Sequence, residues 1–369
     1  RRIMKIQKIK VYQVDLPLIE AEFKFGPEKS VSTFDSTVVE IETDSGIKGV
    51  GEACTIGNAY LPAFSKGARE GLKELAPEMI GENPLELKKI NDRMDYLLKG
   101  HPYVKSAFDI ACWDILGKAS GLPVCTLLGG RYGEKVQLYR TICQQSPEET
   151  ARNVLKYKKE GYSKFQLKLG GNVNEDIESI RRTREALDPS DVLICDANCG
   201  WQSHEAIRLA NAVKDLDIYL EQPCPTYEEC LRVRQHTDLP FIIDELADDV
   251  HMLMKIHHDN AADAVNLKIC KLGGLTKATQ ARDLCIKIGL VMNLEDSWGG
   301  DIATATIAHF AQSTPEKFRF LCTDFNSYNT VRNATGAPER ENGFMQASKL
   351  PGLGVTPIYE ALGNPVFQL

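Results

Sequence analysis

Short apolar segments alternate with amphipathic segments through the middle of the chain. The apolar segments predict eight buried strands, at residues 136–142, 163–170, 192–198, 218–222, 240–245, 264–269, 289–295 and 317–322. Between them, apolar residues at helical spacing predict helices over 147–160, 175–187, 204–216, 227–236 and 276–288. Alternating strands and helices form a parallel sheet, and eight strands is the number that closes a (β/α)8 barrel. A doubly wound open sheet is the alternative, but no glycine-rich phosphate turn follows residue 142.

The first 130 residues show a different order of elements. Strand patterns over 3–16 and 37–44 come first, and helical spacing follows over 63–75, 85–98 and 105–120. Strands followed by helices are typical of an α+β module. The glycine pair at 129–130 and the charged residues after it mark a boundary. We therefore expect an α+β domain over residues 1–130 and an α/β barrel domain over residues 131–344.

Composition narrows the classes of partner. Hydrophobic residues make up 43% of the chain and charged residues 26%, which is typical of a globular protein, and no apolar run is long enough to cross a membrane. Lys and Arg number 44 against 51 Asp and Glu, without a basic block, so we expect no nucleic acid partner. The 11 cysteines form no CxxC pair and mostly lie in apolar runs. Together with the absence of a secretory signal, this favours a reducing cytoplasm.

Carboxylates stand at the C-terminal ends of three consecutive predicted strands, where barrel enzymes carry their active sites. Asp196, Glu221 and Asp244 are separated by 25 and 23 residues, one strand–helix unit each. Neighbouring strands lie about 4.8 Å apart, so we expect the three carboxylates to converge. Converging carboxylates need a cation, and an all-oxygen set suits Mg²⁺ before Mn²⁺ or Ca²⁺. The alternative is that each carboxylate forms an ordinary ion pair with a Lys or Arg.

Two lysines form a second set at the same edge. Lys168 ends the second predicted strand and Lys268 the sixth, so they are expected on opposite walls of the barrel. A substrate between them would face one amine or ammonium group on each side. The pKa of a Lys near other cations falls enough for it to act as a base at neutral pH. The alternative is that both lysines only balance the carboxylates.

Several longer motifs are spread over nearly the whole chain. They are SAFDIACWD at 106–114, PVCTLLGG at 123–130, DAN at 196–198, EQP at 221–223, DE at 244–245 and KICKLGG at 268–274. Together they resemble the enolase superfamily of the muconate lactonizing enzyme and mandelate racemase type. The resemblance implies an N-terminal α+β capping domain, completed by a C-terminal segment at about 345–369, over a modified (β/α)8 barrel. It also implies Mg²⁺ on Asp196, Glu221 and Asp244, with Lys168 and Lys268 as the acid and base.

One position departs from the family pattern. The second strand of the family commonly carries Lys-x-Lys, but Gln166 occupies the first of these positions here. In the family the first Lys assists the second electrostatically. Its absence would weaken the lowering of the Lys168 pKa, although Gln166 could still donate a hydrogen bond.

Aromatic residues near an acidic mouth suit a substrate with a cationic nitrogen. The chain offers Tyr60, Trp298 and two phenylalanines in a loop at 23–25. The segments at 57–60 and 298–301 are similar to those of family members that act on proline betaines and hydroxyprolines. Ordinary loop packing is the alternative for these aromatic residues.

The remaining polar residues at the strand ends are expected to bind substrate or to support the site. They are Gln166, Asn198, Glu245 and Asp296. Asp296 could instead orient Lys268, which precedes it by one strand.

With a lysine on each face of a substrate carboxylate's α-carbon, proton removal and return from opposite sides inverts that carbon. A leaving group on the next carbon would be expelled instead. We therefore expect a racemase or epimerase of a proline-type or N-substituted amino acid such as a betaine. The alternative reaction is dehydration of a hydroxylated acid such as cis-3-hydroxyproline, and a barrel that only binds ligands is a third reading. The partner is a small-molecule carboxylate, and a homo-oligomer is expected.

Overall fold

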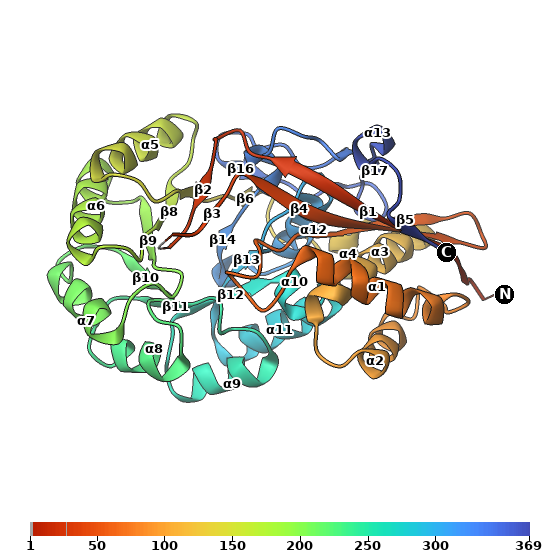
Figure 1. Cartoon of the computed structure of the whole chain (residues 1–369), viewed down its shortest axis with the longest axis horizontal. Coiled ribbons are helices and arrows are strands. Elements are labelled where there is room, and N and C mark those ends of the chain that lie inside the picture. Colours follow the sequence, from red (N-terminus) through yellow and green to blue (C-terminus); the bar gives the residue numbers. More distant parts are fainter. Residues whose placement is uncertain (1–2, 27) are drawn as a thin grey trace.

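The computed structural model describes residues 3–26 and 28–369, and it shows a cap against one edge of a barrel (Figure 1). The cap contains β1 (Ile6–Pro17), β2 (Phe23–Lys24), β3 (Ser30–Val31), β4 (Thr33–Thr43), β5 (Lys48–Ala53), α1 (Ser65–Met79), α2 (Leu87–Leu97), α3 (Pro102–Ser120) and α4 (Val124–Leu127). Its antiparallel sheet has the order β18-β1-β4-β5, so β18 (Phe367–Gln368) joins from the far end of the sequence. The sheet is thus built from segments at both ends of the described chain.

Helix α3 packs directly on β5, and glycine makes this contact possible. A Cβ atom on Gly51 would lie 2.0 Å from the carbonyl oxygen of Ala107, and one on Gly49 would lie 2.3 Å from that of Ala111. Only glycine leaves room for the helix backbone at this distance. The cap core forms behind it, with Ile9, Val39, Leu72 and Phe108 among its buried side chains.

The barrel strands lie in the order in which they occur in the sequence, and every neighbouring pair is parallel. They are β7 (Arg140–Ile142), β8 (Lys164–Lys168), β9 (Val192–Asp196), β10 (Tyr219–Glu221), β11 (Phe241–Ile243), β12 (Ala264–Lys268), β13 (Val291–Glu295) and β14 (Arg319–Cys322). The sheet curls back on itself, so that its first and last strands come together. The Tyr139 amide, just before β7, donates to the carbonyl oxygen of Cys322 in β14 at 2.9 Å. The predicted fold class, a capped and modified barrel, is confirmed.

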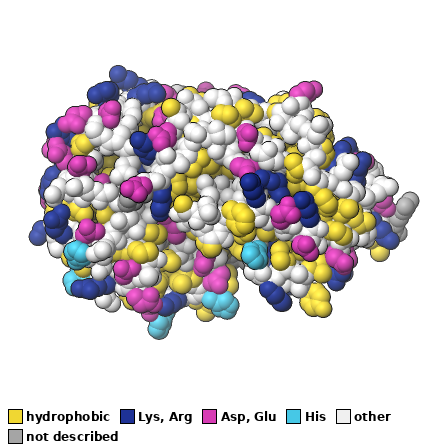
Figure 2. Space-filling model, in the orientation of Figure 1, with side chains coloured by type: hydrophobic (Ala, Val, Ile, Leu, Met, Phe, Trp, Pro, Cys, Tyr) yellow, Lys and Arg dark blue, Asp and Glu magenta, His cyan; other side chains and the backbone are white. Residues whose placement is uncertain are grey.

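Helices follow the barrel strands, and most of them cover the outside of the barrel (Figure 1). They are α5 (Pro147–Lys159), α6 (Val173–Ala186), α7 (Ser203–Ala212), α8 (Tyr227–Arg234), α9 (Val250–His258), α10 (Ile269–Leu272), α11 (Leu275–Ile288) and α12 (Asp301–Gln312). The remaining elements are β6 (Val136–Gln137), η1 (Glu316–Phe318), η2 (Phe325–Tyr328), β15 (Ala334–Thr335), β16 (Phe344–Met345), β17 (Thr356–Pro357) and α13 (Tyr359–Leu362). None of the described helices is both long and apolar enough to span a bilayer. On the face shown in Figure 2, Lys and Arg side chains are interspersed with Asp and Glu.

Some elements differ from the sequence-based expectation. The strand predicted over 136–142 is divided, because β6 pairs antiparallel with β16 and only β7 enters the barrel. Helix α12 was not predicted, because all of its residues are buried and it has no polar face. It lies between the cap and the barrel, in contact with β5 and β13.

The hairpin of β2 and β3 extends from the cap over the barrel strands β8 and β9 (Figure 1). The Gln144 amide donates to the Lys24 carbonyl oxygen at 3.2 Å, which ties the hairpin to the loop after β7. The cap therefore covers the C-terminal ends of the barrel strands, where the predicted site residues lie.

Candidate active site

Parallel pairing brings the predicted residues to one level of the barrel. Lys168 is in register with Asp196, and Asp196 is in register with Glu221. Asp244 follows directly after β11, and Lys268 ends β12. All five side chains are buried. The strand ends thus place both lysines and all three carboxylates in a single buried layer.

On one side of this layer, Lys168 forms an ion pair with Asp196, with 2.5 Å between Nζ and Oδ2. Burial alone would lower the pKa of Lys168, but the carboxylates of Asp196 and Glu221 outweigh it and raise that pKa. The amides of Gln166 and Asn266 donate to the two oxygens of Glu221, at 2.9 and 2.6 Å. Gln166 therefore supports Glu221 in this structure, as a hydrogen-bond donor.

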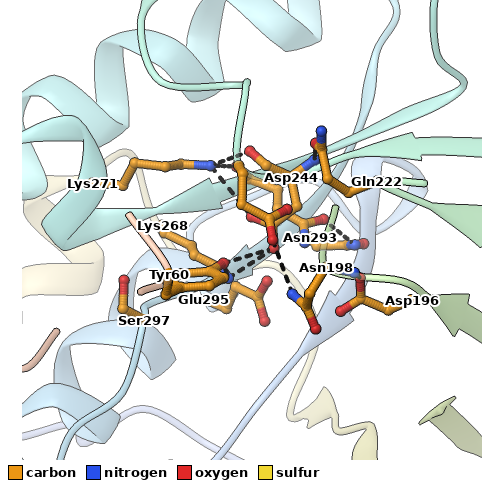
Figure 3. Close-up of polar contacts among 12 residues, drawn as sticks. Tyr60, Asp196, Asn198, Gln222, Asp244, Lys268, Lys271, Asn293, Glu295 and Ser297 are labelled. Atoms are coloured by element: carbon orange, nitrogen blue, oxygen red, sulfur yellow. Dashed lines mark hydrogen bonds and ion pairs between the residues drawn. The ribbon is translucent and has the colours of Figure 1, made fainter. Parts of the chain in front are cut away.

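On the other side, Lys268 pairs with Asp244, with 2.8 Å between Nζ and Oδ2. The Tyr60 hydroxyl, from the cap, donates to the same oxygen at 2.9 Å and accepts from Lys268. Lys268 also lies 4.5 Å from the centre of the Tyr60 ring. Lys271 donates to the Asp244 carbonyl oxygen at 2.5 Å and to that of Asn266 at 3.0 Å. Figure 3 shows Lys268, Tyr60 and Lys271 converging on Asp244.

These contacts and burial shift the pKa values of the groups on the Lys268 side. Burial would lower the pKa of Lys268, but Asp244 and Glu295 outweigh it and raise that pKa above its ordinary value. Burial would likewise raise the pKa of Asp244, but Lys268 and Lys271 hold it below its usual range. For Lys271 burial dominates, and its pKa is lowered.

A cavity of about 610 Å³ lies beside Lys168. The β2–β3 hairpin forms one of its walls, with Lys24 and Ser30, and barrel residues Gln144 and Asp176 form another. Lys268 is not among the described residues that line it. A ligand entering under the hairpin would therefore meet Lys168 first.

Asn198 and Glu245 form a linked pair above the carboxylates. The Asn198 amide donates to Glu245 Oε1 at 2.9 Å, and both side chains are buried. Burial, together with the charges of Asp244 and Asp196, raises the pKa of Glu245 to about 8. The structure thus brings Asn198 and Glu245 into the same cluster as the predicted metal ligands.

Asp296 and Trp298 lie in settings that differ from those expected of them. Asp296 accepts hydrogen bonds from the backbone amides of Cys270 and Ser297, at 2.9 and 2.7 Å, and burial raises its pKa to about 7. It thus anchors α10 through Cys270 and makes no hydrogen bond to Lys268 among the contacts described.

The indole of Trp298 is fully buried between cap and barrel. It stacks on Phe34 with 4.1 Å between ring centres, and its Nε1 donates to Asn329 at 3.0 Å. Phe325 lies 4.6 Å away, and Phe23 packs edge-on. The structure therefore places Trp298 in an aromatic core that joins the two domains.

Two family models cover most of the chain. The N-terminal domain model of mandelate racemase / muconate lactonizing enzyme matches residues 22–129, and the "Enolase C-terminal domain-like" model matches residues 149–361. The chain belongs to the mandelate racemase/muconate lactonizing enzyme group of the enolase superfamily. The resemblance carried by its sequence motifs is confirmed, and the chain is an enzyme of this superfamily.

Individual relatives cover nearly its full length. A cis-3-hydroxy-L-proline dehydratase from Roseibium aggregatum is 55% identical, over 98% of this chain and 99% of its own length. An N-succinyl-L-Arg/Lys racemase from Bacillus cereus is 30% identical over 95% of each. A mandelate racemase/muconate lactonizing enzyme from Roseovarius nubinhibens, solved in complex with magnesium, aligns with a TM-score of 0.96 at 33% identity, over 99% of this chain and 100% of its own.

The superfamily implies a divalent cation, and the charges of the site fit one. Among the described residues, six buried carboxylates and three buried lysines gather here. The carboxylates are Asp196, Glu221, Asp244, Glu245, Glu295 and Asp296, and the lysines are Lys168, Lys268 and Lys271. Burial and mutual repulsion raise the pKa of both Asp196 and Glu221. The site therefore has more buried carboxylates than lysines, and their oxygen atoms are the ligands that a hard cation prefers.

The side chains themselves are not set as metal ligands in this structure. No three described His, Cys, Asp or Glu side chains form a group that could hold a metal ion. Asp196 and Asp244 are instead paired with Lys168 and Lys268, and Glu221 with two amides. The three carboxylates and their positions at the strand ends fit a cation. In this structure, however, their partners are lysines and amides.

Sequence reasoning did not assign roles to Lys271, Asn266 or Tyr139. Lys271 lies three residues after Lys268, on the short helix α10, and this helical spacing was a usable signal for a second lysine at the same site. Asn266 lies two residues before Lys268 on β12 and therefore shares its face. Tyr139 donates to Glu295 from the loop before β7, and no local pattern indicates that contact.

Proposed function

We propose that this enzyme is a Mg²⁺-dependent dehydratase of a 3-hydroxylated, proline-type amino acid. The observation that carries the proposal is the pair of buried lysines at one level of the barrel. Lys168 ends β8 and Lys268 ends β12, four strands apart in an eight-stranded sheet that curls back on itself. The pair offers a proton acceptor and a proton donor on opposite sides of a ring that lies between them.

The relatives support water loss over inversion as the net reaction. The Roseibium dehydratase shares 55% of its residues with this chain, and the Bacillus racemase shares 30%. This reverses the order that we expected from the sequence alone, where racemisation came first and dehydration was the alternative. Both reactions begin with removal of the same α-proton, so the site assignment is common to them.

The elimination balances with the groups that the site provides. One lysine, as the free amine, takes the proton from the α-carbon, and the electrons of that C–H bond form a double bond to the neighbouring carbon. The bond from that carbon to its hydroxyl oxygen breaks at the same time or after. The other lysine, as the ammonium, gives its proton to the departing oxygen, which leaves as water.

The opposed lysines predict a stereochemical preference. In a cis-3-hydroxyproline the hydroxyl and the carboxylate share one face of the ring, so the α-proton points to the other face. Acid and base on opposite sides match this arrangement. In the trans isomer, hydroxyl and α-proton leave from the same face, and one lysine would have to serve both.

The carboxylates of Asp196, Glu221 and Asp244 would hold the metal. A divalent cation bound there would neutralise the charge that builds on the substrate carboxylate as its α-proton leaves. The amides of Gln166 and Asn266 keep Glu221 in place. Tyr60 holds Lys268 from the cap side, and the β2–β3 hairpin lies over β8 and β9 (Figure 1).

The test uses purified enzyme with Mg²⁺ in D₂O and four substrates, cis- and trans-3-hydroxy-L-proline and L- and D-proline. Loss of water and α-deuteration are followed by mass spectrometry, and the ring product by NMR. We expect rapid water loss from the cis-3-hydroxy acid alone. Inversion of proline without water loss from any hydroxy acid would contradict the proposal and favour the racemase. Equal rates for the cis and trans isomers would contradict the assignment of opposed acid and base.

Two properties remain predictions from the sequence, a cytoplasmic location and a homo-oligomeric state. Light scattering on the eluting protein would measure the mass of the assembly directly.

A further inference from the structure

The proposed substrate carries a cationic ring nitrogen, and the aromatic faces expected to receive it are already in use. Trp298 is stacked on Phe34 inside the core between the domains. The ring of Tyr60 carries the Lys268 ammonium 4.5 Å from its centre. Trp298 is therefore not available for a cation–π contact with the substrate, and a second cation at Tyr60 would be repelled by Lys268, so an acidic partner suits the nitrogen better.

Apart from Asn293 Oδ1 on β13, two buried acceptor atoms at the site lack a hydrogen-bond partner within the described part of the chain. They are Asn198 Oδ1 and Glu245 Oε2, and they belong to side chains that are 2% and 8% exposed. The two side chains are joined through their other polar atoms, because Asn198 Nδ2 donates to Glu245 Oε1 at 2.9 Å. Leaving a buried acceptor without a hydrogen bond is costly, so two such atoms on one linked pair indicate a ligand that supplies donors.

The other five carboxylates of the site have their donors already. Asp196 and Asp244 receive lysines, Glu221 receives two amides, Glu295 receives the Tyr139 hydroxyl, and Asp296 receives two backbone amides. Of the six, only Glu245 has a buried oxygen that is left without a partner. Glu245 follows Asp244 directly in the sequence, and its partner Asn198 lies two residues after Asp196. Both side chains are therefore next to the buried layer of lysines and carboxylates.

We propose that Asn198 and Glu245 bind the secondary ammonium of the substrate ring. A protonated ring nitrogen has two N–H donors, and the pair offers two free oxygens, one of them on Glu245, whose ionised form a neighbouring cation favours. Hydrogen bonds from a cation to a carboxylate are about twice as strong as neutral ones. The positive charge would also relieve the repulsion among Glu245, Asp244 and Asp196. This inference rests on the proposed function, because it assigns a role toward that substrate class.

The experiment compares two ring acids that have no hydroxyl leaving group and differ only at this atom. L-Proline carries the ammonium, and (S)-tetrahydrofuran-2-carboxylate has an ether oxygen in its place. Binding of each is measured by calorimetry with saturating Mg²⁺, for the wild type, Glu245→Gln and Glu245→Asp. Glu185→Gln, at an exposed position on α6, is the matched control for loss of one negative charge.

We expect the wild type and Glu185→Gln to prefer proline by about 10–100-fold. In Glu245→Gln the preference should fall below about threefold, while affinity for the ether changes little. Glu245→Asp keeps the charge with a shorter reach and should keep part of the preference. Affinity for the ether reports whether each variant is folded, and a titration with Mg²⁺ alone reports the metal site.

Four results would overturn the assignment. A full preference for proline in Glu245→Gln would show that another group binds the nitrogen. A fall in Mg²⁺ affinity, with both ring acids weakened equally, would show that Glu245 acts through the metal. Equal binding of both acids by the wild type would contradict the ammonium site but not the proposed function. Binding of neither acid would contradict both.

Discussion

Lys168 and Lys268 are the same residue type at the same level of one barrel, but their surroundings differ. Lys168 has one carboxylate partner and lines a cavity of about 610 Å³ under the hairpin. Lys268 is enclosed by Asp244 and by both the hydroxyl and the ring of Tyr60. A racemase uses its two bases in turn for the same task. An elimination needs one acceptor and one donor, and two unequal settings suit that division.

The strongest test of this comparison is removal of each lysine. Lys168→Ala and Lys268→Ala should each lower the rate of water loss by at least about 10²–10⁴-fold, the contribution of a positioned acid or base. Only one of them, the variant that retains the base, should still exchange the α-proton of the hydroxy acid with D₂O. Lys287→Ala, at an exposed position on α11, should keep the wild-type rate. If each variant exchanges one enantiomer of proline, the two sides are equivalent and the enzyme is a racemase.

Glu221 lies between the two sides, since its oxygens accept one amide from β8 and one from β12. Glu221→Gln removes one charge at nearly constant size. We expect Mg²⁺ affinity to fall by more than the 10–100-fold that loss of an outer-shell partner costs, with water loss falling in parallel. Calorimetric titration measures the affinity, and the wild type treated with EDTA and then resupplied with Mg²⁺ is the control. Activity that survives EDTA treatment and dialysis would rule out the metal.

Tyr60 is the cap's contribution to the Lys268 side. Tyr60→Phe keeps the ring over Lys268 but removes the hydroxyl shared by Lys268 and Asp244. Because hydrogen bonds to charged groups contribute about 1.5–3 kcal/mol, kcat should fall by about 10–100-fold. Tyr359→Phe removes a hydroxyl that donates to Glu40 in the cap, and should leave kcat unchanged. A KM effect without a kcat effect would show that Tyr60 contacts substrate and does not hold Lys268.

The smallest expected effect concerns Gln166 on the Lys168 side. Gln166→Lys restores the Lys-x-Lys pattern, and a second ammonium beside Lys168 favours its neutral form. The pKa of Lys168 should therefore fall, and the acidic limb of the pH–kcat/KM profile should move to lower pH by about one unit. We expect less than a tenfold change in kcat at the optimum. An unmoved acidic limb would show that Lys168 does not titrate in that limb.

The layer of site residues could be predicted because it depends on a repeating local pattern. A charged residue after each apolar strand, one strand–helix unit apart, gives the register of Lys168, Asp196 and Glu221. The same reasoning failed for α12, since a helix buried on all sides has no polar face to reveal its period. Only the packing of the cap on the barrel determines that burial.

Contacts between segments that are far apart in the chain could not be predicted from the sequence either. Tyr60 and Lys268 are 208 residues apart, and nothing in either segment indicates that the hydroxyl of one meets the amine of the other. Trp298 could be placed near the cap but not in an aromatic core, because its neighbour Phe34 comes from β4. Such contacts depend on how two domains dock, which strand and helix periodicity does not encode.

The pairing of β18 with β1 has a consequence for how the protein is made. Residues 6–17 leave the ribosome before the barrel is synthesised, and residues 367–368 emerge only after it. Until then the outer edge of β1 has unpaired amide and carbonyl groups, which can pair with a strand of another nascent chain. Pairing of residues 367–368 with Lys10 and Val11 therefore shortens the edge of β1 that is open to misassembly.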